Sequence, residues 1–128
     1  STLADVVLDE GDYAAAPSLL AESLTLNHEL GDQTAIAYVL EGYGGLAAAQ
    51  GQPVRALRLA GFAAALREAI GAPLPPAEQE RVDRMLAPAR QALSTTAATV
   101  AWTAGQTMLL ADAIAYALRN GATEPPMP

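Results

Sequence analysis

The chain contains no cysteine and no lysine, and it has one histidine and six aromatic residues among its 128 positions. Without cysteine there is no disulfide framework, no thiolate metal site and no cysteine nucleophile. The phosphate-binding pattern Gly-x-x-x-x-Gly-Lys-Ser/Thr is absent, and no lysine is present to reach a nucleotide phosphate. These absences argue against an enzyme. The sequence offers no nucleophile–base pair of the kind that a small hydrolase needs.

Positive charge and long apolar runs are also scarce. The chain has 14 acidic residues against seven arginines, which gives a formal net charge of −7. Because binding to phosphates needs a basic face, we expect no direct contact of this segment with nucleic acid. The longest apolar run near the end, Met108 to Leu118, contains Asp112 and is too short to span a bilayer. We therefore expect no membrane partner and a cytoplasmic location.

Alanine is the residue that the chain has in abundance. It fills 30 positions, and 52% of all residues are hydrophobic. Alanine is the strongest helix former because it loses no side-chain entropy in a helix. No segment alternates polar and apolar residues for long enough to predict a strand. The composition therefore predicts an all-α fold with closely packed helices.

A short sequence recurs at a fixed offset. GDYAAA at 11–16 is followed forty positions later by GQPVRA at 51–56, and ELG at 29–31 recurs in the same register as AIG at 69–71. Self-similarity at such a period is typical of helical-repeat proteins, in which each unit buries its apolar face against a neighbour. The repeat favours a binding scaffold over a catalyst.

Glycine and proline divide the chain into expected helices. Gly31, Gly51 and Gly71 end helices, while Pro53 suits the first turn of one. We expect helices over about 1–10, 12–30, 33–50, 53–70, 78–93, 95–104 (stopped by Gly105) and 109–119, with a proline-rich linker at 71–76 and a kink at Pro88.

The expected third helix has the clearest apolar stripe. It consists of Ile36, Val39, Leu40, Tyr43 and Leu46. In the second helix we expect Leu19, Leu20, Leu24 and Leu26 or Leu30 to face inward. The glycines at 42, 44 and 45 each cost about 1 kcal/mol relative to alanine in a helix. They indicate that a neighbouring backbone packs closely against the third helix.

Gly-Asp-Tyr-x-x-Ala at positions 11–16 resembles the opening of the second helix of a tetratricopeptide repeat. Gly44 and Ala56 stand where that repeat has its small residues, as do Ala4 and Ala16 in the earlier copy. The resemblance implies antiparallel helix pairs in a right-handed superhelix of about seven helices. It implies repeats over 1–71 with a truncated first helix, closing helices over 72–121, and a flexible tail at 122–128.

The longer repeat is similar to the C-terminal regions of large bacterial LuxR-type transcriptional regulators and signal-transduction ATPases. The likeness lies in LGDQTAIAYVLEGYGGLAAAQG at 30–51, in LREAIGAPLPPAE at 66–78, and in Trp102 with Gly105 and AIAYAL at 113–118. It implies a non-catalytic sensor or partner-binding segment, with the ATPase and DNA-binding modules elsewhere in the parent protein. We therefore expect the chain to be a C-terminal fragment whose first helix is normally covered by a preceding repeat.

In tetratricopeptide arrays the first helix of each pair lines a concave groove, and the resemblance carries this role to the third helix. The implied groove residues are Gln33, Thr34, Tyr38, Glu41, Gly45 and Ala48. The expected occupant is a protein or peptide, another domain of the parent protein, or a second copy of the chain. The alternative is a small-molecule inducer held in the groove, as relatives with this organisation imply.

Other polar groups have simpler interpretations. His28 fits a solvated helix end, and the acidic groups at 9–12 and 78–83 fit helix termini. The hydroxyl groups at 94–99 fit capping. Trp102, Met108 and Tyr116 predict either a pocket or a satellite core. We expect no catalytic residue, no cofactor and no metal site.

Overall fold

The computed structural model describes residues 16–119, which form six helices and no strand. The helices are α2 (Ala16–Leu30), α3 (Gln33–Ala49), α4 (Pro53–Ile70), α5 (Pro76–Ala92), α6 (Thr95–Gln106) and α7 (Leu110–Leu118). The predicted all-α class is confirmed. Within the described range, no helix has both the length and the apolar content needed to cross a membrane. The expected first helix, the acidic group at 9–12 and the tail at 122–128 lie outside this range.

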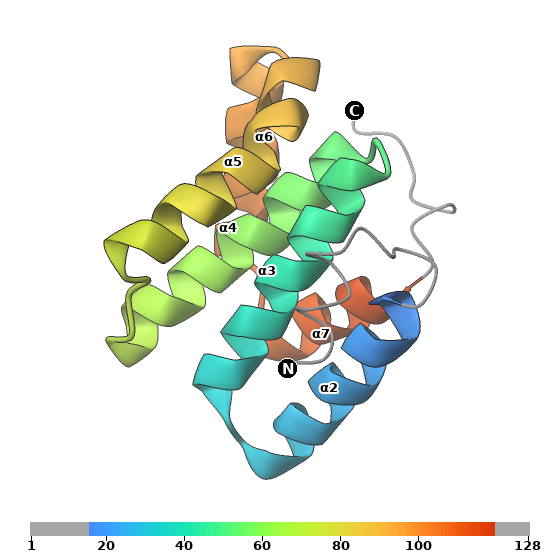
Figure 1. Ribbon diagram of the computed structural model, residues 1–128, viewed down its shortest axis with the longest axis vertical. Helices are drawn as coiled ribbons and strands as arrows, with labels where there is room; N and C mark the ends of the chain where they lie inside the picture. The colour runs from blue at the N-terminus through green and yellow to red at the C-terminus, as the bar shows by residue number, and fades with distance from the viewer. Residues whose placement is uncertain (1–15, 120–128) are drawn as a thin grey trace.

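Helices α3 and α4 form an antiparallel pair at the centre of the molecule, with α5 and α6 on one side and α2 and α7 on the other (Figure 1). This pair takes part in two hydrophobic cores. One core joins it to α2 and α7 through residues such as Leu24, Leu40 and Ile114. The other joins it to α5 and α6 through Leu57, Leu86 and others. The central pair is therefore buried on both sides, against α2 and α7 on one and against α5 and α6 on the other.

Three glycines end α2, α3 and α4 in the same way. Gly31, Gly51 and Gly71 have φ angles of 71°, 71° and 68°, in the left-handed region that glycine adopts without steric cost. After each glycine, the next backbone N–H donates to a carbonyl five residues earlier, as Asp32 does to Asn27 at 3.0 Å. This is the Schellman arrangement, which satisfies carbonyl groups at the helix end. The predicted ends of these helices are therefore confirmed to within a residue.

The apolar stripe predicted for α3 is confirmed, since all five of its residues are buried. The expected close approach of a backbone is confirmed at Gly44, where an added Cβ would lie 3.3 Å from the carbonyl oxygen of Ala56. At Gly45 an added Cβ would lie 2.9 Å from the sulfur of Met85 in α5. Helix α3 is thus approached by the backbone of α4 at one glycine and by a side chain of α5 at the next.

The structure corrects the prediction for α2. Leu20 and Leu24 are buried, but Leu26 and Leu30 are 55% and 69% exposed. Both lie toward the C-terminal end of α2, and neither belongs to the core that α2 shares with α3 and α7. The inward-facing role expected for Leu26 or Leu30 is therefore wrong.

A second correction concerns Gly105. It does not stop α6, which continues to Gln106. Gly105 is buried, and an added Cβ would collide with the backbone of Arg58 in α4. At Gly61 of α4, an added Cβ would likewise collide with the backbone of Trp102 in α6. These glycines let α4 and α6 pack backbone to backbone.

One buried side chain of α4 binds the C-terminal end of α7. Arg55 donates hydrogen bonds to the backbone carbonyls of Tyr116, Ala117 and Arg119 at 3.0, 2.7 and 3.1 Å. Its guanidinium carbon also lies 5.1 Å from the centroid of the Tyr116 ring. A cation at the C-terminal end of a helix is favoured by the helix dipole. Arg55 therefore satisfies the last carbonyls of α7 and fixes the position of that helix.

Candidate functional site

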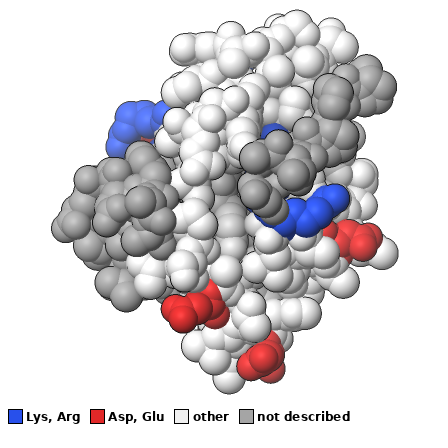
Figure 2. Space-filling view, turned by 90° about the vertical axis from the view of Figure 1, so that its right-hand side faces the viewer, with Lys and Arg blue, Asp and Glu red and all other residues white. Residues whose placement is uncertain are grey.

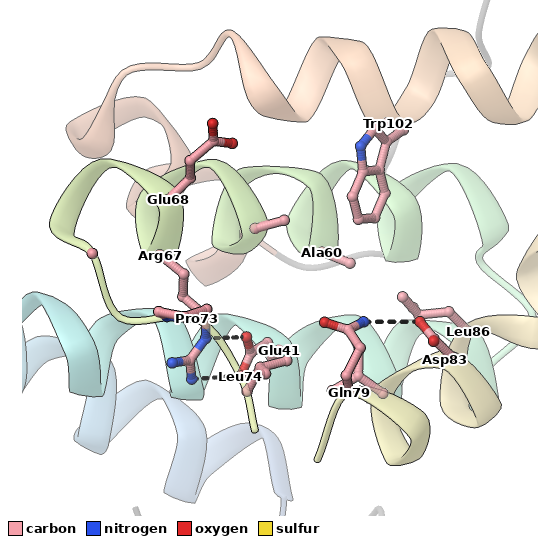
Figure 3. A pocket seen from close by; sticks show the side chains of 13 residues that line it. Glu41, Ala60, Arg67, Glu68, Pro73, Leu74, Gln79, Asp83, Leu86 and Trp102 are labelled. Atoms are coloured by element: carbon pink, nitrogen blue, oxygen red, sulfur yellow. Dashed lines mark hydrogen bonds and ion pairs between the residues drawn. The ribbon is translucent and has the colours of Figure 1, made fainter. Parts of the chain in front are cut away.

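A cavity of about 350 Å³ lies between α4, α5 and α6. Figure 3 shows it with Trp102 extending from α6 toward Ala60, and with Arg67 and Glu41 at the other end. Most of its wall is apolar, and the polar groups are few. The lining residues are Glu41, Ala60, Ala64, Arg67, Glu68, Gly71, Pro73, Leu74, Gln79, Val82, Asp83, Leu86 and Trp102.

The local sequence explains why a hollow forms here. The wall contributed by α4 has alanines at 60 and 64, whose short side chains leave space above the helix. The chain then turns at Gly71 and runs without helix through 72–75 before α5 begins at Pro76. The prolines at 73, 75 and 76 restrict this segment because each fixes its own φ angle. Small side chains on one wall and a stiff connection to the next helix together create the cavity.

A buried ion pair closes one end of the cavity. Arg67 donates from Nε to Oε2 of Glu41 at 2.6 Å and from its Nη2 to Oε1 at 3.0 Å. Its Nη1 donates to the carbonyl oxygen of Ala72 at 3.1 Å. Glu41 and Arg67 are only 6% and 9% exposed. Charges removed from water in this way must be paired, so the two side chains hold α3, α4 and the 71–75 segment together.

Two further carboxylates line the cavity at its exposed side. Asp83 accepts a hydrogen bond on Oδ1 from the side-chain amide of Gln79 at 2.9 Å, and both residues are exposed (Figure 3). Glu68 is also exposed and stands on α4 next to Arg67. The described residues of the lining therefore include three carboxylates and one guanidinium, which together carry a formal charge of −2. Within residues 16–119, the one ion pair present is that of Glu41 with Arg67, and neither Asp83 nor Glu68 pairs with a basic side chain.

Trp102 lines a second, more open hollow of about 400 Å³ together with Arg90, Thr95, Ala98 and Thr99. The guanidinium carbon of Arg90 lies 5.0 Å from the centroid of the indole. Trp102 packs against the core of α5 and α6, whereas Tyr116 belongs to the core of α2 and α7. Trp102, Met108 and Tyr116 therefore form neither the suggested pocket nor a satellite core of their own.

The six groove residues predicted on α3 lie in different surroundings. Gln33 and Thr34 are exposed at the start of the helix, and Tyr38 is half-buried. Glu41 lies in the cavity, Gly45 faces Met85, and Ala48 packs partly buried against the core of α5 and α6. Of the six, only Glu41 lines the cavity. That the other five bind a partner remains a prediction.

Sequence reasoning missed most of the cavity. Asp83 in its α5 wall was interpreted as a charge at a helix terminus, and Trp102 in its α6 wall as part of a satellite core or of a pocket with Met108 and Tyr116. The available signal was the run of alanines on α4 followed by three prolines within four residues, at 73, 75 and 76.

Among the hydroxyl groups at 94–99, Ser94 caps α6 by accepting a hydrogen bond from the N–H of Ala97 at 3.0 Å. Asp32 caps α3 in the same way, by accepting one from the N–H of Ala35 at 3.1 Å. His28 is exposed in the last turn of α2. Within the described part of the chain, no three histidine, aspartate or glutamate side chains converge in a way that would hold a metal ion.

Charged side chains are sparse on the face shown in Figure 2, which lies on the side of α2 and α7. Basic and acidic groups are scattered there among uncharged residues rather than gathered in a stripe.

No protein-family profile, curated protein or solved structure matches the chain significantly.

Proposed function

We propose that this chain is a non-catalytic ligand-binding domain whose binding site is the cavity between α4, α5 and α6. The observation that carries the proposal is the cavity itself, a hollow of about 350 Å³ with mostly apolar walls and a few polar groups. Sites for small molecules usually combine these properties. Among the described residues, the lining contains no serine, threonine, histidine, cysteine or lysine, which favours binding over nucleophilic catalysis.

We extend the proposal to a sensor segment of a bacterial transcriptional regulator, built as tetratricopeptide-like helix pairs in a right-handed superhelix. The resemblance of 30–51 and 66–78 to LuxR-type regulators supports this role. The close contact of Gly44 with Ala56, at the positions of the small residues of the repeat, supports the architecture. The cavity lies between the repeat helices and the closing helices, so a bound molecule would alter how α5 and α6 rest on α4.

A second candidate function is self-association through the end of α2. Leu26 and Leu30 are one helical turn apart and highly exposed, next to the exposed Gln33 and Thr34 of the predicted groove. A second copy of the chain would cover them. Analytical ultracentrifugation tests this candidate: wild type should sediment as a dimer and the double variant Leu26→Glu, Leu30→Glu as a monomer. A monomeric wild type at all concentrations would refute it.

The binding site is tested by nuclear magnetic resonance with three probes of similar shape: 2-phenylethanol, 2-phenylethylammonium and 3-phenylpropionate. The chain has a single tryptophan, so one indole N–H signal reports directly on the cavity wall. At least one probe should shift that signal together with backbone signals of 64–86. If none of the three shifts them at millimolar concentration, the proposed function is wrong.

A blocking variant confirms the location. Ala64→Phe places a large side chain in the cavity and should abolish the shifts. The matched control is Ala69→Phe, on the same helix at an exposed position outside the cavity lining. Equal binding by both variants would place the probes elsewhere on the molecule.

A further inference from the structure

We infer that the ligand of this cavity is a small organic cation, an amine with an apolar body. This inference rests on the proposed function and adds the chemical class of the ligand. It is carried by the charges that line the cavity and by the partners that each of them already has.

Within the described lining, the one positive side chain is already paired and offers an anion little net charge. All three nitrogens of the Arg67 guanidinium donate hydrogen bonds, two to Glu41 and one to the carbonyl of Ala72. Three of its five N–H groups are used in this way, and the carboxylate of Glu41 balances its charge. An anionic ligand that took the place of Glu41 would leave a buried carboxylate without its partner, which is strongly unfavourable. The cavity is therefore poorly suited to carboxylates and phosphates.

The negative side chains of the cavity are in the opposite situation. Oδ1 of Asp83 accepts from Gln79, and this bond orients the carboxylate while its second oxygen accepts no hydrogen bond from any residue between 16 and 119. The side-chain carboxylate of Glu68 makes neither a hydrogen bond nor an ion pair with any residue of the 16–119 range. With Glu41 neutralised by Arg67, these two carboxylates give the cavity its negative charge. An ammonium group would compensate it, and Asp83 is its expected partner.

The remaining wall suits the apolar part of such a ligand. Ala60, Val82 and Leu86 offer aliphatic surface, and Trp102 offers an aromatic ring. A cation near the face of an indole is attracted by the ring quadrupole. The fold already uses this contact, since Arg90 lies over Trp102 and Arg119 lies 5.0 Å from the ring centroid of Tyr116. The walls and the charges thus point to the same ligand class.

The test compares the affinities of the three probes in the titration described above. 2-Phenylethylammonium should bind most tightly, 2-phenylethanol more weakly and 3-phenylpropionate most weakly. Raising the salt concentration should weaken the first and leave the second unchanged, because screening acts only on the charged pair.

Two isosteric variants locate the effect. Asp83→Asn and Glu68→Gln should each weaken the ammonium probe by about two- to fivefold, the range expected for one exposed ion pair. They should not change the affinity of 2-phenylethanol. The matched control is Glu80→Gln, which removes an exposed carboxylate of α5 outside the cavity lining and should have no effect.

The outcomes distinguish the charge of the ligand from the existence of a ligand-binding cavity. Tighter or equal binding of the alcohol or the propionate would overturn the cationic ligand while leaving a ligand-binding cavity in place. Equal weakening by Glu80→Gln would mean that only the overall charge of the protein attracts the probe, which would also overturn it. Failure of all three probes would refute the proposed function itself.

Discussion

The backbone of Gly105 in α6 lies directly against the backbone carbonyl group of Arg58 in α4, with no room for a side chain between them. The reciprocal contact, of Gly61 with the backbone of Trp102, lies on the facing helix. Because backbone cannot move aside as a flexible side chain can, the separation of α4 and α6 depends on these two glycines. That separation also sets the position of Trp102 and hence one wall of the cavity.

The first prediction concerns this contact. Gly105→Ala should lower the free energy of unfolding by about 1–3 kcal/mol, as overpacking of a tight interior does. Helix propensity alone would predict the opposite, a gain of about 1 kcal/mol. Gly44→Ala is the matched comparison, since its added Cβ would lie 3.3 Å from Ala56 and should cost less. Chemical denaturation measures both, and a Gly105→Ala variant more stable than wild type would contradict the packing described.

The second prediction concerns the buried ion pair. Glu41→Ala should destabilise the fold by about 3–5 kcal/mol, because it leaves the Arg67 guanidinium buried without its partner. The double variant Glu41→Leu, Arg67→Met should recover much of that loss, since it removes both charges at similar volume. The single variants Glu41→Leu and Arg67→Met and the double variant form a double-mutant cycle in urea denaturation. A strictly additive cycle would show that the two side chains do not act as a pair.

The third prediction concerns the attachment of α7. Arg55→Met removes the three hydrogen bonds to the carbonyls of 116, 117 and 119. Amide hydrogen exchange within 110–118 should become faster, with a loss of protection of at least about 1.5 kcal/mol. Exchange in α5 should stay close to that of wild type. Arg90→Met is the control, because Arg90 contacts Trp102 and lies outside the core of α7. Equal effects of the two variants on α7 would contradict the role given to Arg55.

Some of these features could be predicted from the sequence, and others could not. The ends of α2, α3 and α4 were predictable because a glycine turn is satisfied by hydrogen bonds within five residues. The exposure of Leu26 was not, since it depends on which neighbours reach α2. Glu41 and Arg67 stand 26 positions apart, and no local pattern joins them. The prediction that Gly105 ends its helix was wrong because glycine serves both as a helix stop and as a site of close packing.

The last prediction concerns Tyr43, which is 6% exposed in the core between α3 and its neighbours. Burial raises the pKa of its phenol from 10.0 to about 12, and the nearby charge of Arg55 opposes part of that rise. The neutral phenol is therefore favoured in the folded state relative to the unfolded chain. Its contribution to stability is fully present below pH 10 and is lost as the pH rises toward about 12.

Tyr43→Phe isolates this effect, because it keeps the ring and removes the titrating group. The free energy of unfolding of wild type, minus that of the variant, should be constant below pH 10 and should fall between pH 10 and about 12. The fall should be on the order of 1–2 kcal/mol, since each pKa unit corresponds to about 1.4 kcal/mol. Urea denaturation across this range measures the difference, while titration of the other tyrosines cancels in the subtraction. A difference that stays constant to pH 12 would mean that Tyr43 ionises as readily in the folded state as in the unfolded chain.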